Sequence, residues 1–278
     1  LTFSYPEFIE NIIAKFVNAS TMDGYNPYRI TKEGIDWEVE EPDNPWSYIG
    51  YWGDHQIIYL QKMLEQSKKF HPQRLNELLH HPIFSYANVP YKIKSFDELL
   101  ENAKSTVIFD NELADKIDLK VTTLGADGKL VLTANNEVYH VNLLEKLLVT
   151  LLCKFGNFVV DGGIWLNTQR PEWNDANNAL VGQGLSMVTL YYVRRYLCFF
   201  QQLIANETAT VSLSKEVNQW LNETAAALAI LSSLLIERAS DNVLTAQLRY
   251  DSLTALGKAA CNYRQKVYQQ EGFSGKVD

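Results

Sequence analysis

Residues 170–178 bring acidic, aromatic and carboxamide side chains close together. The stretch reads Arg170, Pro171, Glu172, Trp173, Asn174, Asp175, Ala176, Asn177 and Asn178. Carboxylates and carboxamides hydrogen-bond sugar hydroxyls, and a Trp ring can cover the apolar face of a pyranose. A carboxyl group beside an aromatic ring can have its pKa raised, as a general acid requires near neutral pH. These residues indicate a sugar site with acid–base chemistry, although Asp and Asn also cap helices.

A second polar and aromatic segment runs from Trp46 to Gln56 and includes Trp52, Asp54 and His55. Like the first segment, it pairs Trp with Asp shortly before a predicted helix, where Asp also serves as an N-terminal cap. If the helices pack as antiparallel hairpins, both segments reach the same end of the array. We therefore expect the two segments to form one site.

The spacing of apolar residues predicts a mainly helical chain. Ser4 and Glu7 form a capping-box pattern in front of an apolar helix face. Helices are expected at about 5–18, 54–69, 73–80, 95–103, 110–117, 138–155, 184–205, 213–238 and 241–270. Residues 19–50 and 156–180 are long polar loops, which in compact domains are usually functional.

One β element is expected within this helical pattern. Residues 119–124 and 129–133 flank Gly125, Ala126, Asp127 and Gly128, which is a hairpin signal. The chain is therefore expected to form a single helical domain over residues 1–278, with a β-hairpin insertion at about 119–133.

Composition narrows the classes of partner. The net charge is −8, and no basic run is present, which argues against nucleic acid and membrane-surface binding. The longest apolar stretch, at 143–153, is too short to span a bilayer. Cys153, Cys198 and Cys261 are far apart and are expected to be free thiols, which favours a reducing compartment such as the cytoplasm. We expect no metal and no organic cofactor, and the oligomeric state is left open.

Two motifs resemble glycoside hydrolase family 94, the family of cellobiose and chitobiose phosphorylases. Residues 51–60 resemble the family segment Ser-Asp-Asp-His-Leu-Trp-Leu, and residues 172–178 resemble Asp-Trp-Asn-Asp-Gly-Met-Asn. Residues 181–188 are similar to the stretch Gly-Lys-Gly-Glu-Ser-Val that follows in the family. The motifs occur in the family's order, and each leads into a predicted helix.

The resemblance implies an (α/α)6 toroid that cleaves β-glycosides with inversion, with phosphate as nucleophile. It implies that Asp175 is the general acid and that Asp54 holds hydroxyls of the glucosyl unit in an oligosaccharide substrate. The remaining residues expected to contact the sugar are Trp52, His55, Arg170, Trp173 and Asn174.

Departures from the family pattern leave alternatives open. Gly53 stands where the family often has Asp, Glu172 replaces Asp, and no match to the family's phosphate-binding residues is found. Hydrolysis therefore stands beside phosphorolysis with inorganic phosphate as co-substrate. An inverting hydrolase needs a base about 6.5–9.5 Å from the acid; the candidates are Glu172, Asp161, Glu38, Glu40 and Glu41.

Non-catalytic roles form a separate class of interpretation. A carbohydrate-binding or structural helical module would keep the aromatic residues without using the acid, and a helical interaction scaffold would need no sugar site. About seven substantial helices are expected, whereas a complete (α/α)6 toroid has twelve, and the chain begins at Leu1. These features favour a piece of a larger enzyme.

Overall fold

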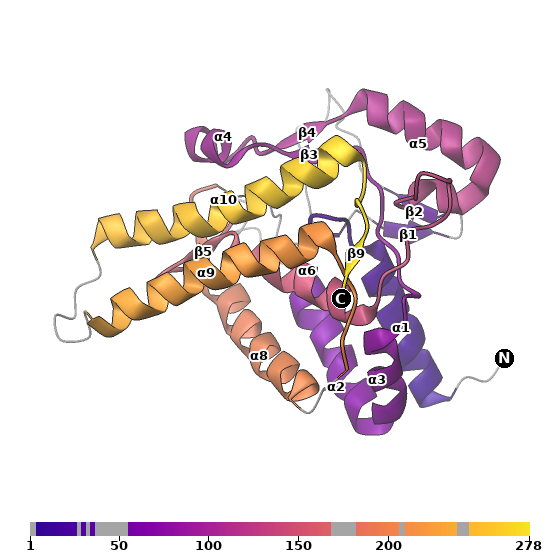
Figure 1. The fold of residues 1–278 in the computed structure, drawn as a ribbon, viewed down its shortest axis with the longest axis horizontal. Helices are drawn as coiled ribbons and strands as arrows, with labels where there is room; N and C mark the ends of the chain where they lie inside the picture. The colour runs from indigo at the N-terminus through magenta and orange to yellow at the C-terminus, as the bar shows by residue number, and fades with distance from the viewer. Residues whose placement is uncertain are drawn as a thin grey trace.

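The computed structural model describes residues 4–26, 29–31, 34–36, 55–167, 182–205, 209–237 and 245–278. These residues form a mainly helical fold with small antiparallel sheets (Figure 1). The predicted helical class is therefore confirmed, and the toroid stays a prediction.

The helices follow the predicted order with shifted ends. They are α1 (Tyr5–Ala19), α2 (Leu60–Phe70), α3 (Pro72–His80), α4 (Phe96–Glu101), α5 (Asn111–Leu124), α6 (Leu143–Phe155), α8 (Met187–Ile204), α9 (Lys215–Glu237) and α10 (Ala246–Gln270). A π-helix, η1 (His55–Tyr59), leads directly into α2, and a 3-10 turn, η2 (Gly125–Lys129), follows α5.

The strands are short and pair only with antiparallel neighbours. Strands β1 (Arg29–Thr31) and β2 (Gly34–Asp36) form one hairpin, and β3 (Tyr91–Ile93) pairs with β4 (Val107–Phe109). Strands β5 (Phe158–Val159), β6 (Gly163–Trp165) and β7 (Leu185–Ser186) form a three-stranded sheet. Strand β8 (Leu213–Ser214) pairs with β9 (Lys276–Val277).

The predicted capping box at the start of α1 is present. The Ser4 hydroxyl oxygen accepts from the Glu7 backbone N–H at 3.4 Å, and the Glu7 carboxylate accepts from the Ser4 N–H at 2.9 Å. Ser95 and Glu98 make the same reciprocal pair at the start of α4. Because a capping box depends on residues three apart, the sequence specifies these helix starts locally.

The hairpin predicted at 119–133 is wrong. Residues 119–124 continue helix α5, whose N-cap Asp110 accepts from the Leu113 N–H at 3.0 Å. The buried residues of α5, Leu113 and Ile117, lie one helical turn apart before this region. The helix then continues to Leu124 although no residue from 118 to 124 is buried. Gly125, with φ of +64°, then forms the C-cap of the helix. The glycine-rich stretch therefore ends a helix and forms η2.

The predicted hairpin also required an extended segment at 129–133. Residues 130–132 are extended, but their hydrogen-bond partners are not residues 119–124. The Val131 N–H donates to the Tyr86 carbonyl, and the Val131 carbonyl accepts from Tyr139, both at 2.9 Å. The contact with Tyr86 joins segments 45 residues apart, whereas Tyr139 lies eight residues beyond Val131, across a local antiparallel turn.

Helix α6 is at the centre of the fold. Leu143 and every residue from Glu145 to Lys154 are buried, and α3, α9, α10 and η1 pack against this helix. Helices α9 and α10 run side by side as an antiparallel pair (Figure 1), and Trp220 stacks on Tyr263 between them at a ring-centroid distance of 4.2 Å.

Two of the buried charged groups of α6, Glu145 and Lys146, have polar partners. The Glu145 carboxylate accepts from the Tyr86 hydroxyl at 3.0 Å and from the Ser214 N–H at 2.7 Å. Burial raises the pKa of this carboxyl group above its usual value. The Lys146 amine donates to the Ser20 and Ser85 carbonyls at 3.1 and 2.7 Å, and burial lowers its pKa well below the usual value. These bonds connect α6 to three distant segments.

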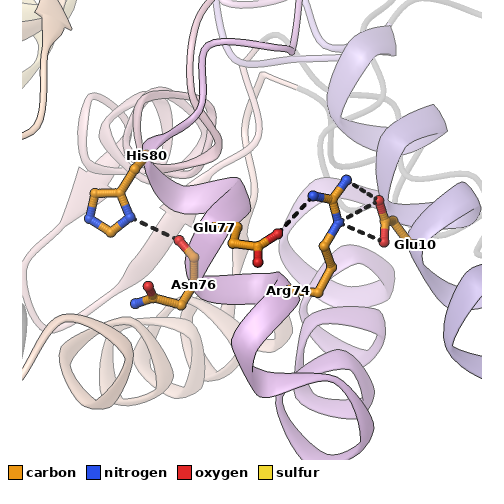
Figure 2. A network of polar contacts seen from close by, with 5 residues as sticks. All are labelled: Glu10, Arg74, Asn76, Glu77 and His80. Atoms are coloured by element: carbon orange, nitrogen blue, oxygen red, sulfur yellow. Dashed lines mark hydrogen bonds and ion pairs between the residues drawn. The ribbon is translucent and has the colours of Figure 1, made fainter.

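A surface network joins α3 to α1 (Figure 2). The Arg74 guanidinium donates to the Glu10 carboxylate at 2.9–3.2 Å and to Glu77 at 3.0 Å. Near the end of α3, His80 Nδ1 lies 2.8 Å from the Asn76 carbonyl oxygen. The groups are partly exposed, so this network contributes to orientation more than to stability.

Candidate functional site

Most residues of the predicted site lie outside the described residues. These are Trp52, Asp54, Arg170, Glu172, Trp173, Asn174 and Asp175, together with the alternative bases Glu38, Glu40 and Glu41. His55 begins η1, and its backbone alone is described. The two motif segments are residues 46–56 and 170–178. The structure describes η1, where the first segment ends, and strands β6 and β7, between which the second segment lies in the sequence.

Residues 168–181 connect two strands of one sheet. Strand β6 pairs with β7, with Trp165 opposite Leu185. Beyond this pair, Leu166 and Gly182 are hydrogen-bonded through their backbones at 2.5 Å, and the Trp165 indole N–H donates to the Gly182 carbonyl at 3.2 Å. Strand β7 runs directly into α8, whose N-cap is Ser186. Asp175 is therefore not the N-terminal cap of α8.

The segment that ends at Asp54 leads into η1. This π-helix packs against α1, α6 and α8, and its residues Ile57 and Ile58 are buried. A π-helical turn is rare and is found mostly at functional sites.

Helices α2 and α8 run parallel. Three side-chain contacts join them in the same order along both helices: Lys62 with Tyr192, Glu65 with Arg195, and Lys68 with Phe199. Because the residue numbers rise together, the N-terminal ends of η1–α2 and of α8 lie at the same end of the pair. The described residues that follow the two motif segments therefore lie at the same end of this helix pair. That the segments themselves form one site stays a prediction.

The parallel arrangement of α2 and α8 also affects the electrostatic potential at the end where both helices begin. A helix carries a partial positive charge at its N-terminus, which stabilises nearby negative groups. Two helix N-termini at one end add their fields there. Such a field would stabilise a negatively charged group at that end.

Two buried carboxamides next to the start of residues 168–181 were not predicted as site residues. Asn157 Nδ2 donates to the Tyr25 hydroxyl oxygen at 2.9 Å, and Asn167 Nδ2 donates to Asn157 Oδ1 at 2.8 Å. The Lys154 ammonium lies 5.0 Å from the centre of the Tyr25 ring and makes no hydrogen bond. The only signal in the sequence was the presence of polar residues inside an otherwise apolar region.

Asp161 has a partner that disfavours it as the base. It lies in the turn between β5 and β6, with φ of +56°, at the opposite end of β6 from Asn167. Its carboxylate pairs with Arg249 of α10 at 2.8 Å. This ion pair favours a role in holding the turn against α10.

No model of a known protein family matches the chain. No curated protein is significantly similar to it in sequence. The resemblance to glycoside hydrolases therefore stays a prediction based on the two motifs.

Three further findings on the described residues concern membrane-spanning helices, clusters of metal ligands and disulfide bonds. In the ranges that the structure covers, no helix has the length and apolar character needed to cross a membrane. Within the same ranges, no three His, Cys, Asp or Glu side chains come together as metal ligands. Cys153, Cys198 and Cys261 are free thiols, as predicted.

Proposed function

We propose that this chain carries the site of an enzyme that cleaves glycosidic bonds of an oligosaccharide, by general-acid catalysis with inversion. In this proposal the helices belong to an (α/α)6 toroid or to part of one. The parallel packing of η1–α2 and α8 supports the proposal, because the helices that follow the two motif segments begin at the same end of that pair. A single site formed by both segments requires that arrangement.

In the proposed reaction, Asp175 donates a proton to the glycosidic oxygen as the bond to the anomeric carbon breaks. A nucleophile attacks that carbon from the opposite face and forms the new bond, which inverts the configuration. The nucleophile is either phosphate or a water molecule that gives its proton to Glu172. The sugar is held by Asp54, Trp52, His55, Arg170, Trp173 and Asn174.

The test is a turnover screen with β- and α-linked gluco-oligosaccharides, with and without phosphate, detecting free sugar and sugar 1-phosphate. Sugar 1-phosphate formed only with phosphate would identify a phosphorylase. Free sugar in both conditions would identify a hydrolase. Binding without any product would instead indicate a non-catalytic carbohydrate-binding module, and neither binding nor product would contradict the proposal.

The acid is tested with a matched pair of variants. Asp175→Asn should abolish turnover and leave the fold and the sugar affinity nearly unchanged, because an amide cannot donate the required proton. Asp118→Asn makes the same chemical change at an exposed carboxylate of α5, and it should retain activity. Equal turnover by both variants would show that another residue is the acid.

A further inference from the structure

A surface groove lies between α2 and α8, from the middle of each helix toward its C-terminal end. Its volume is about 440 Å³, and it is lined by Glu65, Lys68, Lys69, Arg195, Cys198, Phe199 and Gln202. Pockets that bind small molecules in proteins have volumes of roughly 300–1,000 Å³. The groove is therefore large enough to hold a small molecule.

The side chains that line this groove are mainly cationic. Lys68, Lys69 and Arg195 are opposed by the single acid Glu65, which leaves a net charge of +2 in a chain whose net charge is −8. Among the residues that the structure describes, neither lysine forms an ion pair with an acid. A concave surface with one sign of charge concentrates ions of the opposite sign. The groove therefore favours an anionic ligand.

Two of the cations are held in place, one on each helix. Arg195 donates to the Glu65 carboxylate from Nε at 2.9 Å and from Nη2 at 2.6 Å, which fixes the plane of the guanidinium. Its Nη1 makes no hydrogen bond among the described residues, so two N–H groups remain for a ligand oxygen. The Lys68 ammonium lies 5.5 Å from the centre of the buried Phe199 ring, which places it between the two helices.

We propose that the groove between α2 and α8 binds a small phosphomonoester, such as a sugar phosphate. A phosphomonoester carries about −1.5 to −2 charges at pH 7, which matches the net charge of +2 in the groove. Guanidinium and ammonium groups are the usual cationic ligands of phosphate, and the Gln202 carboxamide can hydrogen-bond hydroxyl groups of the organic part. This site goes beyond the proposed function, since it involves neither motif segment and no turnover.

Cys198 supplies a probe of occupancy, because it is an exposed thiol that lines the groove. A ligand in the groove should slow the reaction of this thiol with a neutral reagent such as iodoacetamide. The labelling rate is followed by mass spectrometry with glucose 6-phosphate, inorganic phosphate, glucose or acetate, all at one ionic strength. Cys153 and Cys261 are buried, so the label on the native chain reports on Cys198.

The expected result is protection by phosphates alone. Exposed ion pairs are individually weak, so we expect a dissociation constant on the order of 1 mM. About 10 mM glucose 6-phosphate should then slow the labelling of Cys198 by about threefold or more. Inorganic phosphate should also protect the thiol, whereas glucose and acetate should not. If glucose 6-phosphate slows labelling no more than acetate does, the proposal is overturned.

Matched lysine variants test whether the groove itself is responsible. The double variant Lys68→Gln with Lys69→Gln removes two of the cations, whereas Lys62→Gln removes a lysine of the same helix that does not line the groove. The double variant should lose the protection, and Lys62→Gln should keep it. Protection that persists in the double variant would overturn the proposal, because both lysines would then serve only the C-terminal end of α2.

The variants and the readout keep this test separate from the proposed function. Substitutions at the helix surface should leave the fold intact, which circular dichroism checks. If the double variant does not fold, Lys69→Gln alone, at an exposed residue, should weaken the protection, and full protection would overturn the proposal. A parent chain that turns over no oligosaccharide would contradict the proposed function, whereas the labelling of Cys198 decides the groove.

Discussion

Arg195 of α8 binds Glu65 of α2 through two hydrogen bonds, Nε to Oε1 at 2.9 Å and Nη2 to Oε2 at 2.6 Å. This bidentate pair joins the two parallel helices at the sixth residue of α2 and the ninth residue of α8. Gln61 extends the connection, since its Nε2 donates to Glu65 at 3.0 Å. The relative orientation of α2 and α8 therefore depends partly on one planar ion pair.

Replacing Arg195 tests that dependence. The side chains are 52% and 27% exposed, so Arg195→Ala should lower the free energy of unfolding by only about 0.5 kcal/mol. Arg195→Lys should recover little of this lost free energy, because the lysine ammonium cannot make the two parallel hydrogen bonds that the guanidinium makes. Denaturant unfolding measures the unfolding free energies of Arg195→Ala and Arg195→Lys. The control is Arg194→Ala, at the adjacent exposed residue. A loss no larger than that of the control would show that the ion pair contributes nothing measurable.

Glu145 should give the stability a distinct pH dependence. Burial raises its pKa in the folded chain above the 4.5 expected for an ordinary glutamate. The folded state therefore binds the proton more tightly than the unfolded state does. The stability from this group is fully present below about pH 4.5 and is lost as the pH rises through the folded-state pKa.

The measurement is the difference in unfolding free energy between the parent chain and Glu145→Gln across a pH series. The glutamine variant lacks the titrating group, although its amide also disturbs the bond from the Ser214 N–H. The advantage of the parent chain should decline above pH 4.5, and a difference that is flat with pH would contradict the raised pKa.

The pair of Trp220 and Tyr263 should be a major source of stability. Trp220 is 2% exposed and stacks on Tyr263 between α9 and α10. Trp220→Ala should lower the unfolding free energy by about 3–5 kcal/mol, because it leaves a large cavity. Ile236→Ala, on the same helix but 74% exposed, should change it by less than about 0.5 kcal/mol. Similar losses at both positions in denaturant unfolding would contradict the observed packing.

The three thiols should differ in their reactivity. Cys198 is exposed, whereas Cys153 and Cys261 are buried. Burial also raises the pKa of the Cys153 thiol, which lowers its thiolate fraction. A thiol reagent followed by mass spectrometry should label Cys198 in the native chain and the other two only after unfolding. Cys198→Ser should show almost no native labelling, and rapid labelling of that variant would mean that a buried thiol becomes accessible.

The sequence by itself determined the helices, because their signals are local. The capping boxes at Ser4 and Ser95 and the apolar spacing along each helix involve residues three or four apart. The sequence also indicated that two polar segments precede helices, and their meeting in one site stays a prediction. The hairpin failed because Gly125 is compatible with both a turn and a helix end, and α5 continues to Leu124 before Gly125 ends it.

Only the tertiary structure decided which distant residues meet. Tyr25 and Asn157 are hydrogen-bonded although 132 positions separate them, and no local pattern encodes such a pair. The parallel direction of α2 and α8 likewise depends on how both helices pack in the fold. Backbone propensity and capping act over a few residues, whereas side-chain contacts between elements arise only when the whole core packs.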